Sequence, residues 1–291
     1  MSKYEIIADS GSTKTDWVIV DENAKPVERI RTIGFNPYFH STEFIFNEIF
    51  SGFSKINIVL EDVQNVNFYG AGCSSKAKNQ TVEKALARMF PNAKIHVDHD
   101  LIAAARASLG NKDGIACIIG TGSNSCIWEN GIVTQNIPSH GYIYGDEGSG
   151  SYLGIELVKL YLEDRLGGNL RSEFKKEFKL SKEQILNSTY KEKDPNVFLA
   201  HFASFYRPHL QYEFLREIVY KGFDDFFQKR VIPYDNYKNY ELGFIGSIAY
   251  FHKEILSEVA KKYGVRIANV NRCPIDALVE FHSLKLNLKM T

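Results

Sequence analysis

The amino-acid sequence contains the same local pattern twice, and this repetition limits the folds that the chain can adopt. In each copy a short apolar run leads into a turn of small and hydroxylated residues, and further strand-like runs follow, over residues 4–33 and again from residue 114. Short apolar runs separated by Gly, Ser, Asn and Pro are typical of consecutive strands joined by tight turns. The pattern predicts an antiparallel three-stranded opening to each of two related halves.

The segment between the two copies alternates between strand-like and helical patterns. After a loop at residues 34–37, Ser41 is placed to cap an amphipathic helix. Strands are then predicted at 66–69 and 93–97, each followed by a helix, at 79–89 and 100–109 respectively. This order favours an α/β domain with a partly parallel sheet, because parallel strands need helical crossovers.

The pattern changes after the second copy. Residues 148–230 are mainly helical in character, with many charged and aromatic side chains. Strands are predicted at 241–245 and 265–270, with a helix that runs to residue 262 between them, and a further helix begins at residue 275.

The composition argues against several functional classes. The 291 residues include 35 Lys plus Arg and 35 Asp plus Glu, and this zero formal charge is not that of a general nucleic-acid binder. No apolar run approaches the ~18 residues of a membrane span, and the start of the chain lacks the pattern of a signal peptide. Four scattered cysteines without C-x-x-C spacing argue against a disulfide framework and a Cys-rich zinc site. We expect a reduced, cytoplasmic protein that binds neither nucleic acid nor membrane.

The first candidate site is the turn DSGSTKTD at residues 9–16. Backbone N–H groups of such a turn can point at one spot and bind phosphate oxygens, with further donors from the hydroxyls of Ser12, Thr13 and Thr15. Asp9 stands at the end of the strand, where it is suited to hold Mg²⁺ through water. The motif is not a Walker A loop, and an ordinary polar turn is the alternative interpretation.

A second turn of the same chemistry, IIGTGSNS, occupies residues 118–125 at the start of the second copy. Two such turns, one opening each half, are suited to bind a polyphosphate from both sides. The pair is harder to obtain by chance than one Gly-rich turn, so the ordinary-turn interpretation is weaker here.

The run HVDHD at residues 96–100 allows three interpretations. On a strand His96, Asp98 and Asp100 share one face, and together with His99 they would suit the metal site of a hydrolase. The same residues also suit a solvated strand end. In the third interpretation Asp100 is a general base where a strand meets a helix, although an Asp there is also a good N-cap. Spacing alone slightly favours the cap.

Two further glycine-containing loops stand before helices. In GDEGSG, residues 145–150, Asp146 is suited either to a sugar hydroxyl or to a helix cap. In GFIGSIA, residues 243–249, small residues let a flat group lie close to the backbone, with helix–strand packing as the alternative.

Together and in this order, the motifs resemble those of the sugar kinase, heat-shock chaperone and actin (ASKHA) superfamily of ATPases. DSGSTKTD is similar to its first phosphate loop, IIGTGSNS to its second and GFIGSIA to its adenosine loop. GFNP at 34–37, the spacing of Asp100 and Ala104, and GDEGS at 145–149 resemble the N-acetylglucosamine kinase branch, which includes the BadF-type ATPases. The resemblance extends over about residues 5–280, and it departs from the branch at Ser10 and Ser12, where glycines are common.

The resemblance implies an α/β protein with two ribonuclease-H-like, actin-like ATPase domains and an ATP cleft between them. The first domain is expected over residues 1–112, completed by a C-terminal helix at 275–291 that crosses back to it. The second is expected over 113–274 with a helical insertion.

The resemblance also implies roles for individual residues. Asp100 matches the catalytic aspartate, and Gly246 matches the adenosine site. Sugar contacts are implied for Asn36, Thr121 and Asp146. Phosphate contacts are implied for the two turns, at Gly11, Ser12, Thr13, Lys14, Thr15, Gly120, Thr121, Gly122 and Ser123.

These matches predict ATP-dependent phosphorylation of an amino sugar, at the 6-OH of N-acetylglucosamine or a related hexosamine. Asp100 would be the general base, with Asp98 as the alternative, and Mg²⁺ would accompany ATP. Two other functions stay open: an ATP-hydrolysing activator of the BadF type, which holds an iron–sulfur cluster between subunits through cysteines, and a non-catalytic sugar-sensing ATPase. The expected partners are the amino sugar, ATP and a second copy of the chain in a homodimer.

Overall fold

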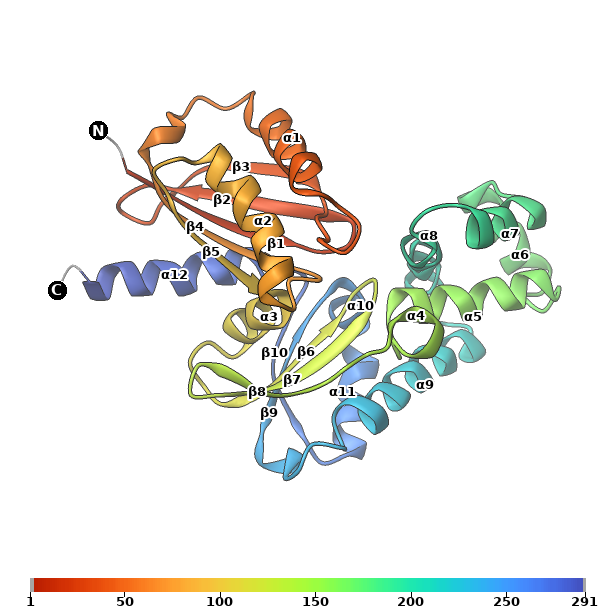
Figure 1. Cartoon of the computed structure of the whole chain (residues 1–291). Coiled ribbons are helices and arrows are strands. Elements are labelled where there is room, and N and C mark those ends of the chain that lie inside the picture. The colour runs from red at the N-terminus through yellow and green to blue at the C-terminus, as the bar shows by residue number, and fades with distance from the viewer. Residues whose placement is uncertain (1–2, 290–291) are drawn as a thin grey trace. The chain divides into compact units, whose positions relative to one another are not determined.

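The structure is a computed structural model that describes residues 3–289, with side chains as far as Leu284. The chain divides into two compact units: one combines Met1–Gly110 with Cys273–Thr291, and the other is Asn111–Arg272. Residues 1–2 and 290–291, which the predicted first domain and C-terminal helix include, lie outside the described residues. Figure 1 shows the helices and strands of each unit.

The first unit is built on one five-stranded mixed sheet. Its strands are β1 (Tyr4–Ser10), β2 (Lys14–Val20), β3 (Pro26–Ile33), β4 (Val63–Gly70) and β5 (Lys94–His99). They lie in the order β3-β2-β1-β4-β5. The pairs β1–β2 and β2–β3 are antiparallel, whereas β4 is parallel to both β1 and β5. The predicted antiparallel opening and partly parallel sheet are both confirmed.

Helices cover both faces of this sheet. They are α1 (Thr42–Phe53), α2 (Lys76–Met89), α3 (Asp100–Ser108) and α12 (Ile275–Lys289), with a short 3-10 helix η1 at Leu60–Asp62. α1 and α2 pack together over one face, and α3 and α12 pack together over the other (Figure 1). Ser41 caps α1 as predicted, because its Oγ accepts a hydrogen bond from Phe44 N at 3.2 Å.

The second unit repeats this topology. Its strands are β6 (Gly114–Ile119), β7 (Ser123–Glu129), β8 (Ile132–Ile137), β9 (Glu241–Ile245) and β10 (Arg266–Asn271). The order β8-β7-β6-β9-β10 matches β3-β2-β1-β4-β5 strand for strand, again with two antiparallel and two parallel pairs. The internal repeat in the sequence therefore corresponds to two sheets of one design, as in the predicted fold class.

The predicted helical region is confirmed. It contains α5 (Gly150–Leu162), α6 (Gly168–Phe178), α7 (Lys182–Lys191), α8 (Pro195–His201) and α9 (Glu213–Arg230), with 3-10 helices η2 (Phe202–Phe205) and η3 (Arg207–His209). The short helices α4 (Gly141–Tyr144) and η4 (Tyr237–Asn239) lie outside it. The single helix predicted to end at residue 262 is instead two, α10 (Ser247–Phe251) and α11 (Lys253–Lys262), because the backbone of His252 leaves the helical region. Within residues 3–289, no helix is both long and apolar enough to cross a membrane.

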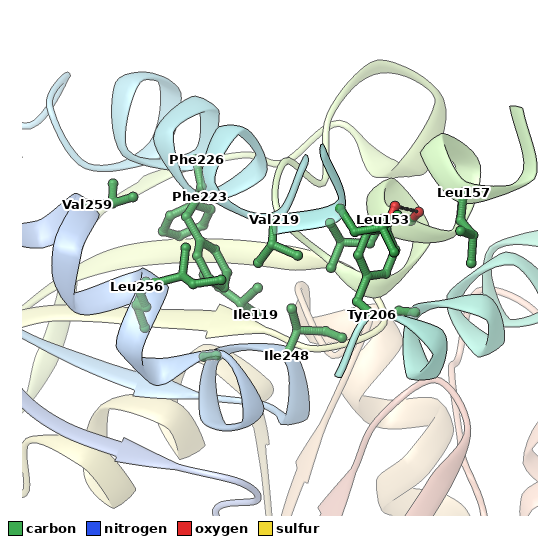
Figure 2. Packing of buried hydrophobic residues seen from close by; sticks show 14 of the residues in the cluster. Ile119, Leu153, Leu157, Tyr206, Val219, Phe223, Phe226, Ile248, Leu256 and Val259 are labelled. Carbon is green, nitrogen blue, oxygen red and sulfur yellow. Dashed lines mark hydrogen bonds between the residues drawn. The ribbon is translucent and has the colours of Figure 1, made fainter. Parts of the chain in front are cut away.

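The core of the second unit lies where α5, α9 and α11 meet its sheet. Figure 2 shows Ile119 of β6, Val219 of α9 and Leu256 of α11, which are all fully buried. Burial of apolar surface contributes roughly 25 cal/mol per Å². The hydroxyl of the buried Tyr206 donates to Leu153 O at 3.0 Å, so this polar atom is not left unpaired in the core (Figure 2).

Candidate active site

Parallel pairing aligns the carboxyl ends of three strands in the first unit. Ser10 of β1 pairs with Gly70 of β4, and Gly70 pairs with His99 of β5. Asp9 lies at this edge near the end of β1, and Asp100 directly follows β5 as the first residue of α3. Ligands of open α/β sheets bind outside the carboxyl ends of the strands. The edge is therefore the candidate site of the first unit.

The turn between β1 and β2 presents its hydroxyls to solvent. Gly11 N donates to Lys14 O at 3.0 Å and closes the turn, while Ser12 and Thr13 are exposed. Gly34 packs against the back of the turn, where an added Cβ would lie 2.2 Å from Gly11 O. A side chain at position 34 would therefore displace the turn.

Two hydroxyls hold the base of this turn from inside the unit. Ser10 Oγ accepts a hydrogen bond from Phe35 N at 2.9 Å and lies 2.8 Å from Thr15 Oγ1, and both side chains are fully buried. Thr15 Oγ1 also lies 2.8 Å from its acceptor Ile33 O. Ser10, a departure from the related branch, thus ties the loop that carries Asn36 to the turn. A phosphate contact by the Thr15 hydroxyl stays a prediction, and it would require the hydroxyl to give up these contacts.

Lys14 is partnered in this structure. Its Nζ forms an ion pair with Asp16, and Arg31 Nε lies 2.8 Å from the other oxygen of that carboxylate. Burial would raise the pKa of Asp16, but the hydrogen bonds from Lys14 and Arg31 outweigh it and lower the pKa. The predicted phosphate contact of Lys14 requires its Nζ to turn away from Asp16.

Asp9 is placed among negative charges. Burial, followed by the charges of Asp100 and Asp16, raises its pKa from the ordinary 3.8 to about 7, against the opposing charge of Lys14. A cation beside Asp9 would offset this repulsion, and Mg²⁺ prefers a carboxylate combined with retained waters. The residues present therefore fit the predicted magnesium ion.

Replacing Asp9 by Asn should raise the melting temperature of the metal-free, nucleotide-free protein. The raised pKa means that the folded state favours the neutral carboxyl of Asp9. Ionisation of Asp9 therefore does not reduce the free energy of unfolding below about pH 3.8, and it reduces it increasingly until the pH passes about 7. The gain from Asn should therefore be larger at pH 8 than at pH 5 in thermal melts. Asp16→Asn is the matched comparison, and it should destabilise because it removes two ion pairs. An equal gain at both pH values would contradict the assignment.

Asp100 begins α3 with one buried oxygen that lacks a hydrogen bond. The N-cap of α3 is His99, whose Nδ1 lies 3.1 Å from Leu101 N, so the capping interpretation of Asp100 is wrong. Asp100 Oδ1 is buried without a hydrogen-bond partner in the described part of the chain, 2.7 Å from His99 Nδ1. Buried polar atoms are nearly always paired, so this oxygen requires either a proton on His99 Nδ1 or a ligand.

Asn36 is held by its own loop with one polar atom left over. Its Oδ1 accepts from Tyr38 N at 3.0 Å, and its backbone N donates to His40 Nδ1 at 3.2 Å. No hydrogen bond of its Nδ2 occurs among the side chains that the structure describes, as far as Leu284. Gly72, with φ of +80°, approaches this side chain so closely that an added Cβ would lie 2.4 Å from Asn36 Oδ1. Sequence reasoning missed Gly72, because only the fold brings it to Asn36.

In the second unit Gly246, predicted to lie at the adenosine, packs against the turn that is predicted to bind phosphate. An added Cβ at Gly246 would lie 2.1 Å from Ile119 O and 2.9 Å from Gly120 N, and its φ of +129° also favours glycine. The two predicted nucleotide loops of this unit are therefore adjacent.

The GDEGSG loop packs against the same turn at residues 118–125. Gly150 N donates to Gly120 O at 2.7 Å, and Ser151 N donates to Thr121 O at 3.0 Å. These bonds give the loop a fixed conformation, which a ligand-binding backbone requires.

Asp146 connects the two loops through its side chain. It adopts φ of +53°, and its Oδ1 accepts from Ser123 N at 3.0 Å. An added Cβ at Gly122 would lie 2.9 Å from Asp146 Oδ2, so glycine leaves room for the carboxylate. Burial raises the pKa of Asp146, although the Ser123 N–H opposes it. The helix-cap alternative for Asp146 is wrong, because Ser149 caps α5.

Ser123 contributes a second unpaired atom at a predicted site position. Its Oγ is buried and has no hydrogen-bond partner in the described chain. Among the residues with described side chains, Asn79, Asp100 and His252 also have such an atom.

A buried ion pair supports the Asp146 loop, and sequence reasoning missed it. Arg230 donates to Glu147 through Nε at 2.9 Å and Nη2 at 3.2 Å, and the side chains are only 5% and 4% exposed. The same guanidinium donates to Ser139 O at 3.0 Å and to Pro138 O. Burial would raise the pKa of Glu147, but the hydrogen bond from Arg230 outweighs it and lowers the pKa.

The metal-cluster interpretation of HVDHD is wrong. Across residues 3–289, no group of three or more His, Cys, Asp and Glu side chains is arranged to hold a metal ion. His96 is exposed, and Asp98 forms an ion pair with Arg106 at 3.1 Å. The residues of this run therefore serve different contacts.

Comparison with known proteins identifies the family. The model of the BadF/BadG/BcrA/BcrD ATPase family matches residues 8–193, and no curated protein sequence matches the chain. A candidate N-acetylglucosamine kinase from Porphyromonas gingivalis is 38% identical with a TM-score of 0.90, over 96% of this chain and 98% of that chain. A second candidate, from Chromobacterium violaceum, is 14% identical with a TM-score of 0.73 over 96% and 98%.

A more distant match concerns a liganded enzyme. A ROK family glucokinase from Streptomyces griseus, in complex with glucose and AMPPNP, is 18% identical with a TM-score of 0.56, over 97% of this chain and 98% of that chain. At such identities the likeness shows the fold alone. The family model covers most of the chain, and the resemblance inferred from the motifs is confirmed. The chain belongs to the BadF/BadG/BcrA/BcrD ATPase family.

Proposed function

We propose that the protein is an ATP-dependent sugar kinase, which transfers the γ-phosphoryl group to the 6-OH of N-acetylglucosamine or a related hexosamine. The observation that carries this proposal is the position of Asp100 directly after β5, at the strand edge that also carries the turn at residues 11–14. The 38% identity to a candidate N-acetylglucosamine kinase over nearly the whole chain supports the choice of substrate class.

Asp100 acts in this proposal as the general base. Its carboxylate accepts the proton of the sugar hydroxyl while that oxygen attacks the γ-phosphorus in line with the leaving ADP. Phosphoryl transfer depends mainly on alignment and on neutralisation of charge. A rigid position at the first turn of α3 supplies that alignment.

The two turns bind phosphate oxygens through their backbone N–H groups, with hydroxyls from Ser12 and Thr13 in one and from Thr121 and Ser123 in the other. Preformed donors of this kind stabilise charge that develops during transfer. Asp9 would hold Mg²⁺ through water, and the ion, when bound, supplies charge neutralisation at the phosphates. Gly246 leaves space for the adenosine beside the second turn.

Asn36, Thr121 and Asp146 are the proposed sugar contacts. Asn36 can donate through Nδ2 to a sugar hydroxyl, and Asp146 can accept through Oδ2 from another sugar hydroxyl. Sites that bind sugar hydroxyls through buried polar groups discriminate strongly against analogues that lack them.

Gly72→Ala should raise the KM for the sugar about tenfold while the KM for ATP stays unchanged. The new Cβ would displace the Asn36 side chain, and a loss of one sugar hydrogen bond of about 1.4 kcal/mol corresponds to that factor. Gly110→Ala is a matched control, because Gly110 also has positive φ, +63°, but nothing lies within 4 Å of its added Cβ. Initial-rate measurements give the sugar KM of both variants. Equal sugar KM values in Gly72→Ala and Gly110→Ala would argue against a sugar contact by Asn36.

The rival BadF-type activator is less well supported. Cys73, Cys117 and Cys126 are buried and Cys273 is half-buried. A cluster shared between subunits needs exposed thiolate ligands from each of them. The homodimer and the cytoplasmic location remain predictions from the sequence.

An ATP-consumption screen tests the function. Wild-type protein with Mg²⁺ and ATP is mixed with glucosamine, N-acetylglucosamine, N-acetylmannosamine, N-acetylmuramic acid or glucose, and the phosphorylated position is located by NMR. We expect sugar-dependent ADP release with an amino sugar and a 6-phosphate product. Sugar-independent hydrolysis, or visible iron–sulfur absorption in the purified protein, would favour the rival.

A further inference from the structure

We propose that His99 is a positioning residue for Asp100: a proton on His99 Nδ1 holds Oδ1 of the carboxylate and leaves Oδ2 for the sugar hydroxyl. This inference rests on the proposed function, and it concerns a residue to which neither the motifs nor the comparisons give a role in the reaction.

The geometry gives His99 Nδ1 two competing partners. The atom lies 2.7 Å from Asp100 Oδ1 and 3.1 Å from Leu101 N. One ring nitrogen carries either a lone pair or a proton, so it accepts from Leu101 or donates to Asp100, never both. Without a proton, His99 Nδ1 caps α3, and with a proton it holds the carboxylate of Asp100.

The first of these states is unfavourable for Asp100. When Nδ1 accepts from Leu101 N, its lone pair faces Oδ1 at 2.7 Å, and this buried oxygen has no partner among the described residues. When Nδ1 carries a proton, the ion pair with Oδ1 becomes a charge-assisted hydrogen bond, which is among the stronger kinds in proteins.

The electrostatic surroundings of His99 favour the proton. Burial lowers the pKa of His99, but the hydrogen bond and the charge of Asp100 outweigh burial and raise it. The positive end of the α3 dipole disfavours a second positive charge. The carboxylate of Asp100 is therefore the group that retains the proton on His99.

The contact has a consequence for phosphoryl transfer. A carboxylate held by one oxygen cannot rotate freely, so its second oxygen stays in one place for the hydroxyl. A misplacement of a reacting group by about 1 Å can cost on the order of 10²-fold in rate. Orientation by His99 should therefore appear in kcat and not in the KM for ATP.

Three substitutions separate this role from capping. Asn and Asp have nearly the same shape and are both good N-caps, but only Asn can donate to Asp100. We expect His99→Asn to keep kcat within about tenfold of wild type and His99→Asp to lose about 10²-fold, since a carboxylate there repels Asp100. His99→Ala, which removes both cap and donor, should lose both thermal stability and kcat. Equal kcat values for the Asn and Asp variants would show that capping alone matters.

A measurement without turnover keeps this inference separate from the proposed function. The imidazole of His99 is titrated by NMR in wild type and in Asp100→Asn. We expect the midpoint to move to lower pH in the variant, because the group that raises the pKa is gone while burial remains. An unchanged midpoint would overturn the inference even in an active kinase. Absence of phosphate transfer to every sugar tested would overturn the proposed function and leave the titration result standing.

Discussion

Asp100→Asn is expected to lower kcat for sugar phosphorylation by about 10²–10⁴-fold, the usual contribution of a general base. Asn keeps the shape of the side chain and its place in the first turn of α3, but it cannot accept a proton from the hydroxyl. ATP should bind with unchanged affinity, because Asp100 is not a proposed nucleotide contact. Steady-state kinetics together with calorimetric titration of ATP measure both quantities.

The control for this variant is Asp98→Asn. Asp98 lies on β5 close to Asp100 in sequence and is the alternative base, but its carboxylate is paired with Arg106 at 3.1 Å. We expect the Asp98 variant to lose less than tenfold in kcat. Near-normal turnover in Asp100→Asn, or a larger loss in the Asp98 variant, would move the role of base away from Asp100.

Arg230→Met should destabilise the protein by about 3–5 kcal/mol, since removal of one partner leaves a buried carboxylate uncompensated. Glu147 is 4% exposed and takes two hydrogen bonds from this guanidinium. The same change releases Pro138 and Ser139, so the loop that carries Asp146 should lose its fixed conformation. Urea unfolding monitored by fluorescence measures the loss.

A neighbouring residue provides the matched control. Lys229 also lies 3.2 Å from Glu147 but its side chain is 58% exposed, and such pairs contribute about 0–1 kcal/mol. Lys229→Met should therefore leave stability nearly unchanged. The double variant Arg230→Met with Glu147→Leu should recover part of the loss, because no buried charge remains. Equal stability of the Arg230 and Lys229 variants would show that the buried pair contributes little.

Several features of the site could be predicted from local sequence. The turns at 11–14 and 120–122 are visible because glycine and hydroxyl residues between apolar runs leave few conformations other than a tight turn. The helix cap at Ser41 could also be predicted, because it depends on a bond to Phe44 N, only three residues further along the chain. Asp100 was placed correctly at a strand–helix junction, but the N-cap position belongs to its neighbour His99.

Other features depended on pairs that are distant in the chain. Arg230 and Glu147 are 83 residues apart, and either one alone reads as an ordinary surface charge. Gly72 is needed because of Asn36, and Gly246 because of Ile119 O, and neither requirement is visible within its own loop. The break at His252 also interrupts a helix whose local pattern is continuous.

The sequence alone determined the repeated strand–turn–strand design, the mixed α/β class and the loops that identify the family. These depend on the periodicity of apolar residues and on turn chemistry, which act over a few neighbouring positions. Only the tertiary structure decided which oxygen of Asp100 is buried, which histidine contacts it and which arginine supports the Asp146 loop. Those outcomes depend on burial and on contacts between distant segments, and both exist only after the chain has folded.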